Sequence, residues 1–170
     1  IRESDTLNPG FYFVDSIGFK SISFDKSLCK EPVKASDGKI SVLLVEPNKY
    51  PKMIKIDDTL EAMQEVVGGD IEEYMPFEDE VAIICNEEGK ITGMAPNRAV
   101  YEENSREMLD IICGKFFIVY APFEAERFQS LPPDLAEKYR EKFKYPERFM
   151  RVNNEIVAVP FKPVRADKER

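Results

Sequence analysis

The sequence predicts an α+β fold, in which a mostly antiparallel sheet is accompanied by two or three helices. Short apolar runs of strand length outnumber the helical patterns, and the two kinds of segment do not alternate regularly along the chain. Regular alternation is typical of a parallel α/β sheet, so the irregular order favours antiparallel pairing.

The N-terminal region, residues 1–39, is predicted to be a β-hairpin extension. Residues 11–24 contain two short apolar segments around a central turn, and residues 33–39 have the composition of a loop with a turn at Asp37-Gly38. We expect this extension to precede the main core.

The expected core, residues 40–125, opens with two strands. Residues 40–45 form a continuous apolar run that ends at Pro47, and residues 53–56 form a second short run. Runs of this length that are rich in Val and Ile are typical of strands.

A helix is predicted at residues 59–67, where apolar residues fall on one face at positions i, i+3 and i+7. Asp58 and Glu61 have the spacing of a capping box, in which the aspartate accepts hydrogen bonds from the first helix amides. Gly68-Gly69 then provides a C-terminal stop.

The second half of the core is predicted to be strands joined by turns. Glu87–Gly89 is expected to form a hairpin turn that returns the chain through residues 90–92, and residues 94–108 are expected to be a loop with room for a short helix. Further strands are predicted at residues 70–75, 81–85 and 109–119.

The C-terminal region, residues 126–170, is expected to contain a helix, an edge strand and a polar tail. The helix, residues 133–143, ends before Pro146. The strand, residues 155–161, contains Pro160, which cannot donate to a strand ladder and therefore favours an edge position. We expect the three regions to form one compact domain.

Acidic residues are concentrated in the middle of the chain, within a net charge of −8. Residues 57–110 contain sixteen Asp or Glu and three Lys or Arg, a net charge of −13, whereas residues 1–56 and 111–170 carry +2 and +3. Like-charge repulsion disfavours direct nucleic-acid binding through this region.

Two interpretations of the acidic region stay open. The carboxylates could simply keep a soluble protein solvated, or they could form a face that imitates nucleic-acid phosphates and binds a protein with a basic surface. The candidate partner-binding residues are Glu61, Glu65, Glu72 and Glu78.

The residue types that are missing restrict the catalytic mechanisms. The chain has no histidine, no Gly-rich phosphate loop and no CxxC pair, so catalysis would depend on carboxylates, Lys, Tyr or a lone Cys. The carboxylates near Glu72 and Glu78 match no calcium-loop spacing, and we predict no metal and no cofactor. The sequence leaves open whether the protein is an enzyme, but it favours a role without catalysis.

The cysteines and apolar runs indicate a cytoplasmic setting. Cys85 and Cys113 lie inside apolar runs, and with Cys29 they make an odd number without short spacings, so buried free thiols are expected rather than disulfides. No apolar run reaches the roughly 18–20 residues of a membrane span. Because the chain begins with Ile1 instead of Met, we expect that it has been trimmed, processed or cut from a longer polypeptide.

Two pairs of residues are candidates for ligand binding. Asn86 and Glu87 begin the predicted hairpin turn, where they could recognise a ligand or could simply serve the turn. Asn97 and Arg98 lie in the expected exit loop. The Arg98 guanidinium could bind a carboxylate or phosphate ligand, or it could form an ion pair with Glu87 or Asp110 that holds the loop.

Five segments resemble a bacterial and phage family known only as a domain of unknown function, number 3846. The segments are VLLVEP at 42–47, DTLEAMQEVVGGDIEE at 58–73, ICNEEGK at 84–90, APNRA at 95–99 and DIICGKFFIV at 110–119. The resemblance covers roughly residues 40–120. It implies an accessory domain of a mobile genetic element, and it implies no activity and no site.

These observations lead to two hypotheses of different classes. The first is an accessory domain that binds a macromolecule and acts against host defence by placing an acidic face in the basic groove of a nucleic-acid enzyme. The second is a small-ligand binder or enzyme with a site around Asn97 and Arg98. A scaffold module within a longer polypeptide remains a third alternative.

Overall fold

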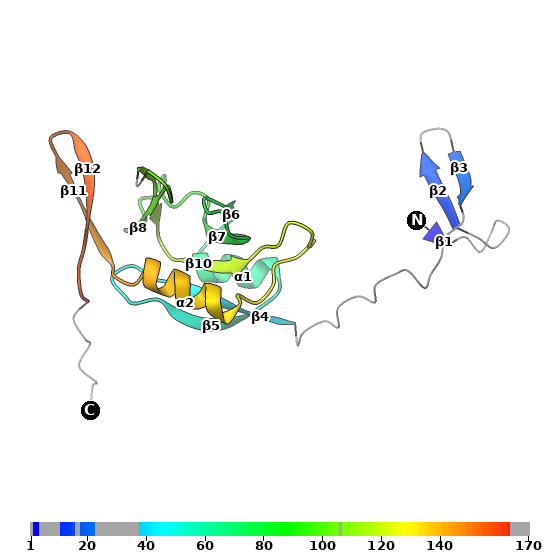
Figure 1. Ribbon diagram of the computed structural model, residues 1–170, viewed down its shortest axis with the longest axis horizontal. Coiled ribbons are helices and arrows are strands. Elements are labelled where there is room, and N and C mark those ends of the chain that lie inside the picture. Colours follow the sequence, from blue (N-terminus) through cyan, green and yellow to red (C-terminus); the bar gives the residue numbers. More distant parts are fainter. Residues whose placement is uncertain (1, 4–10, 16–17, 23–37, 106, 164–170) are drawn as a thin grey trace, which may run out of the picture. The chain divides into compact units, whose positions relative to one another are not determined.

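The computed structural model describes residues 2–3, 11–15, 18–22, 38–105 and 107–163. The chain divides into two compact units, residues 1–35 and 36–170 (Figure 1). In the described residues the fold is mostly antiparallel sheet with two helices, in agreement with the predicted α+β class.

The smaller unit contains a three-stranded antiparallel sheet in the order β1-β2-β3. Its strands are β1 (Arg2–Glu3), β2 (Phe11–Asp15) and β3 (Gly18–Ile22). Two short strands were expected in this region, and β2 and β3 pair directly from Phe11↔Ile22 to Asp15↔Gly18. The turn residues 16–17, the expected loop up to residue 37, Cys29 and the tail from residue 164 lie outside the described residues.

The larger unit is built on a five-stranded antiparallel sheet in the order β5-β4-β10-β7-β6. The predicted strands at 40–45, 53–56, 70–75 and 81–85 are all present in it. The members are β4 (Lys39–Val45), β5 (Lys52–Asp57), β6 (Ile71–Tyr74), β7 (Val81–Asn86) and β10 (Phe116–Tyr120).

Both faces of this sheet are apolar, which explains why its central strands are continuous hydrophobic runs instead of alternating ones. Successive residues point to opposite faces. One core cluster contains Val42, Ile84 and Phe117, and it also contains residues of the first helix. The other contains Leu43 and Ile83, together with residues of the second helix. Each helix therefore covers its own face.

Helix α1 (Leu60–Val67) forms where the sequence predicts it, but its N-cap is Thr59 and not Asp58. The Thr59 hydroxyl accepts a hydrogen bond from the Ala62 amide at 3.2 Å, whereas Asp58 forms an ion pair with Arg127 at 3.6 Å. Gly68 ends the helix with a φ of 81°, a left-handed conformation that glycine adopts without strain.

Helix α2 (Pro133–Lys142) lies on the opposite face of the sheet, as its inward-facing residues show. Tyr139 is fully buried, and its hydroxyl donates to Asp79 at 2.8 Å. Phe143, just after the helix, packs edge-on against Phe116 of the sheet. The predicted helix at 133–143 is confirmed to within one residue.

The expectation of a loop at residues 94–108 and one long strand at 109–119 was wrong. Residues Pro96–Tyr101 form β8, Met108–Cys113 form β9, and the two pair as a separate antiparallel hairpin. Gly114 (φ 81°) separates β9 from β10, and a Cβ on it would lie 2.6 Å from the Met94 sulfur. A glycine inside an apolar run therefore marked a change of sheet.

The expected return strand at residues 90–92 does not form. The chain instead continues in turns, with the Thr92 amide bonded to the Glu88 carbonyl at 2.8 Å and the Met94 amide bonded to the Gly89 carbonyl at 2.9 Å. Thr92 also donates its hydroxyl to the Glu88 carbonyl at 2.9 Å. This local hydrogen bonding competes with strand pairing.

The C-terminal region holds a two-stranded ribbon in place of one edge strand. Strands β11 (Glu147–Val152) and β12 (Glu155–Pro160) pair along their whole length. Asn153 and Asn154 connect them with φ values of 49° and 68°, as a two-residue hairpin turn requires. The ribbon extends beside β8 (Figure 1).

The described cysteines are free thiols, as expected, with Cys85 buried and Cys113 partly buried. Among the described residues, no helix has both the length and the apolar character that a membrane crossing requires.

Candidate functional site

Asn97 and Arg98, the central candidates, are both 1% exposed. They belong to β8, and the β8–β9 register shifts between Pro96 and Arg98. This irregularity leaves Asn97 without a direct partner on β9 and turns consecutive residues of β8 into the interior. The sequence did not signal this burial, because Asn and Arg are residue types that are mostly exposed.

Asn97 connects three segments through its side-chain amide. The nitrogen donates to the carbonyl oxygens of Val45 at 3.0 Å and Gly114 at 2.7 Å. The amide oxygen accepts a hydrogen bond from Arg98 Nη1 at 2.8 Å. One buried side chain therefore holds β8 against the end of β4 and the β9–β10 turn.

Arg98 binds backbone carbonyls far away in the sequence. Nε donates to the Phe143 carbonyl at 3.1 Å, and Nη2 donates to the Lys49 carbonyl at 2.8 Å. Nη1 additionally reaches the carbonyl of Asn97 at 3.1 Å. The guanidinium thus links β8 to the end of α2 and to the β4–β5 turn.

The ion pair suggested between Arg98 and Glu87 or Asp110 is not what the structure contains. Asp110 pairs with Lys90, and the Arg98 hydrogen bonds go to carbonyls and an amide. Burial lowers the pKa of Arg98 to about 10, while Glu147 opposes this shift, so the group remains charged at neutral pH.

Glu147 of β11 is the charged residue beside this buried arginine. Its carboxylate accepts a hydrogen bond from the Ala99 amide at 2.6 Å, which ties the ribbon to β8. Burial raises the pKa of Glu147 above its usual value, and this effect exceeds the lowering by the Ala99 amide and by Arg98. Sequence reasoning did not select Glu147.

Asn86 and Glu87 serve the turn after β7. The Asn86 side-chain nitrogen donates to the Gly68 carbonyl at 3.1 Å, so it binds the end of α1, and its oxygen accepts from the Glu88 amide at 2.9 Å. The Glu87 side chain is exposed, and its amide donates to the Asp70 carbonyl at 2.9 Å.

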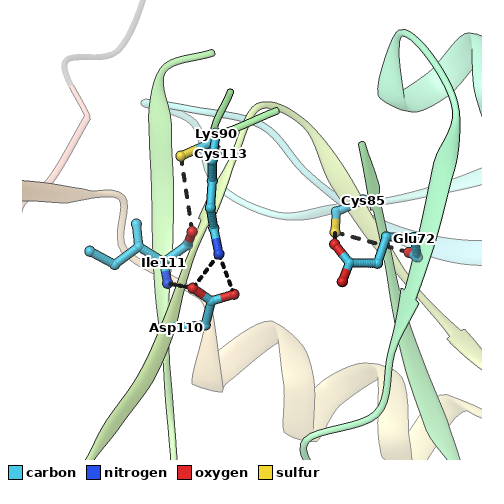
Figure 2. A network of polar contacts seen from close by, with 6 residues as sticks. All are labelled: Glu72, Cys85, Lys90, Asp110, Ile111 and Cys113. Carbon is cyan, nitrogen blue, oxygen red and sulfur yellow. Dashed lines mark hydrogen bonds and ion pairs between the residues drawn. The ribbon is translucent and has the colours of Figure 1, made fainter. Parts of the chain in front are cut away.

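The sequence did not point to a polar contact between Lys90, in the turns after β7, and Asp110 of β9 (Figure 2). Lys90 Nζ contacts the two Asp110 carboxylate oxygens at 2.5 and 2.6 Å. Both residues, with Cys113 and Pro96, line a surface cavity of about 390 Å³. Lys90 could have pointed to this contact in the sequence, because it is one of only three basic residues in the acidic region 57–110.

The thiols near this contact are poor nucleophiles. Cys85 lies 3.9 Å from a Glu72 carboxylate oxygen (Figure 2). Burial and the neighbouring carboxylates raise its pKa to about 12. Burial also raises the pKa of Cys113. Because the thiolate is the reactive form, neither side chain is activated for nucleophilic attack.

The four acidic candidates do not share one face. Glu61 and Glu65 are exposed on α1. Glu72 lies opposite Cys85 in the β6–β7 register, and Cys85 belongs to the core on the α2 side, so Glu72 points to the face opposite α1. Glu78 is exposed in the connection between β6 and β7.

Glu73, which was not selected, does point toward the α1 side, because it lies opposite Ile84. The alternation of side chains along a strand could have separated Glu73 from Glu72. Among the described residues, no group of three or more Cys, Asp or Glu has the arrangement of a metal site.

Comparisons with known proteins give one family. The searches of curated proteins and of solved structures produced no significant match. A family described as a domain of unknown function matches residues 40–144, which span the main sheet, both helices and the β8–β9 hairpin. The match confirms the resemblance seen in the sequence and extends it through α2. Since it covers more than half of the chain, the protein belongs to the DUF3846 family.

Proposed function

We propose that this domain acts in the cytoplasm by binding a protein with a basic surface, and that it has no catalytic activity of its own. The binding surface would be the α1 surface, defined as the exposed carboxylates of Glu61, Glu65 and Glu73 and the neighbouring Phe123. In the setting of a bacterial mobile genetic element, the partner would be a host nucleic-acid enzyme whose basic groove the domain occupies.

The observation that carries this proposal is the uncompensated charge of α1. Glu61 and Glu65 are spaced at i, i+4 on its exposed side, and the helix contains no Lys or Arg that could pair with them. Glu73 adds a carboxylate on the same side of the sheet. These three carboxylates form no ion pair within the part of the chain that the structure describes, and exposed carboxylates attract a cationic surface over several ångströms and accelerate association.

An apolar anchor lies close to Glu73. Phe123 is 77% exposed, and together with Met75 and Glu73 it lines a surface cavity of about 320 Å³. Arg127, another lining residue, pairs with Asp58 directly before α1. An exposed aromatic residue within a charged surface is typical of a protein-binding site.

The free thiols support the cytoplasmic part of the proposal. Cys85 and Cys113 are both unpaired in the structure, and free cysteines are usual in a reducing compartment.

The test compares two charge-reversal variants in capture experiments. The immobilised wild-type chain is incubated with nuclease-treated bacterial lysate, and bound proteins are eluted with salt and identified by mass spectrometry. The Glu61→Lys/Glu65→Lys variant should lose a basic protein that the wild type retains, because the cationic partner then meets lysines on α1.

The matched control is Glu137→Lys/Glu141→Lys. These residues have the same i, i+4 spacing and are exposed on α2, on the opposite face of the sheet. The control changes the net charge equally and should retain the partner. Equal loss in both variants, equal retention in both, or an empty elution from the wild type would contradict the proposal.

A further inference from the structure

Within the described residues, the β11–β12 ribbon has one face that contacts the domain and one that is exposed. Residues directly opposite in an antiparallel pair point to the same face. The face of Glu147, Phe149 and Ala158 is the attached one, because the Glu147 carboxylate binds the Ala99 amide and these three residues are partly buried.

The second face, called the ribbon face below, is apolar and exposed. Met150 and Val157 form its centre, and Val159 and Val152 lie at its base and its tip; the four are 50%, 39%, 38% and 47% exposed, in that order. A two-stranded ribbon alone is marginally stable and has no second layer that could cover these four side chains. Contiguous exposed apolar patches of this kind mark interaction surfaces.

The two ends of the ribbon face carry opposite charges. Arg148 lies at its base, where the guanidinium is held 4.8 Å from the centre of the Phe161 ring. Glu155 lies at its tip, opposite Val152. The two charged residues are on different strands and about 13 Å apart along the ribbon, so they do not neutralise each other.

We propose that the ribbon face is a self-association surface that binds the ribbon face of a second copy of this chain. Two ribbons stacked face to face in opposite directions place the apolar centres in contact and the tip of each ribbon over the base of the other. Arg148 of each copy then lies beside Glu155 of the other, and the pair occurs twice because the interface has two-fold symmetry.

The charges of the ribbon favour a second copy over the basic partner of the α1 surface. Within residues 147–160 the two glutamates balance the two arginines, so the ribbon as a whole attracts neither a basic nor an acidic surface. Only a partner with the opposite order of charges complements the ribbon face, and a reversed copy has that order. The small area implies a weak dimer whose population depends on concentration.

The experiment is sedimentation velocity of the 170-residue chain over a series of concentrations. The wild type should shift from monomer to dimer as its concentration rises. Arg148→Glu and Glu155→Arg should each weaken the dimer by about tenfold, because two attractive pairs become repulsive. The double variant Arg148→Glu/Glu155→Arg should restore wild-type association, because the exchanged charges again face their opposites.

Adjacent residues provide the control for the apolar contact. Val157→Asp introduces a charge on the ribbon face and should leave the chain monomeric, whereas Ile156→Asp, on the attached face and 50% exposed, should not change association. Circular dichroism establishes that both variants fold. A wild type that stays monomeric at every concentration, a double variant that is not restored, or equal effects of the two aspartates would overturn the proposal.

Discussion

The Arg98 guanidinium is the residue-scale feature that organises the α2 side of the domain. It donates to the carbonyls of Lys49 and Phe143, and Asn97 beside it binds those of Val45 and Gly114. These contacts bring the β4–β5 turn, the β9–β10 turn and the end of α2 to β8. A charged side chain is tolerated in this interior because its donors are engaged.

We predict that Arg98→Ala lowers the free energy of unfolding by about 3–5 kcal/mol, because several buried carbonyls lose their donor. Lysine should not rescue the site, since it lacks the planar fork that reaches three directions. Urea denaturation measures the change. The control Arg140→Ala, which removes only a surface pair with Glu137, should change stability by less than about 0.5 kcal/mol.

Comparable stability losses in Arg98→Ala and Arg140→Ala would show that the buried hydrogen bonds contribute little. A large loss in Arg98→Ala alone would indicate that Arg98 stabilises the fold, whereas a small loss would be expected of a residue whose role is to contact a ligand.

A pH dependence is predicted for Glu147, whose pKa burial raises above 4.5 in the folded protein. The folded state then binds the proton more tightly than the unfolded state does. The stability that this group contributes is complete below pH 4.5 and is lost as the pH rises through the folded pKa. Glu147→Gln keeps an acceptor for the Ala99 amide and cannot ionise.

Thermal denaturation at a series of pH values checks this expectation. The stability of the wild type relative to Glu147→Gln should fall as the pH rises above about 4.5. The Lys138 hydrogen bond lowers the pKa of Asp79, so the stability that Asp79 contributes is lost only at lower pH. This loss is the same in the wild type and in Glu147→Gln, so it does not affect their difference. Parallel pH profiles would contradict a raised pKa at Glu147.

At the scale of single elements, the helices were predictable and the hairpins were less so. Helix α1 has a one-sided apolar pattern and a glycine stop, and both signals are local. In contrast, β8 contains Asn97 and Arg98, whose burial depends on carbonyls from distant segments. No pattern within 94–108 reports such contacts, so a loop was the natural expectation.

The break between β9 and β10 is marked in the sequence by a glycine that allowed two interpretations. Gly114 lies inside a hydrophobic run, where a glycine fits either a continuing strand or a turn between two sheets. The β11 strand was missed for a different reason. Its exposed face and mixed charges resemble a loop, and only its pairing with β12 defines it.

The N-cap of α1 gives a prediction at the element scale. Thr59→Ala removes the acceptor of the Ala62 amide and should destabilise the protein by about 1 kcal/mol. Asp58→Ala removes only a pair with an exposed arginine and should have less than half that effect. Chemical denaturation of both variants measures the difference. A larger loss of stability in Asp58→Ala than in Thr59→Ala would indicate that Asp58 is the N-cap, as the sequence predicted.

At the largest scale, the two faces of the main sheet differ in the elements that they carry and in their charge. The α2 side carries the hairpin, the buried Asn97 and Arg98 and the ribbon, whereas α1 presents carboxylates that have no cation within their own helix. The sequence revealed the acidic middle region but could not assign its carboxylates to faces. Glu73 points to the side of the sheet that α1 covers, where Glu61 and Glu65 are exposed, whereas Glu72 points to the other side.

The most direct test of the central claim is a competition between this domain and duplex DNA for a captured basic partner. If the α1 surface imitates phosphates, increasing DNA should displace the labelled wild-type domain from the partner, and the affinity should fall steeply as salt rises. A ternary complex in which partner, DNA and domain coexist, with an affinity insensitive to salt, would contradict the claim.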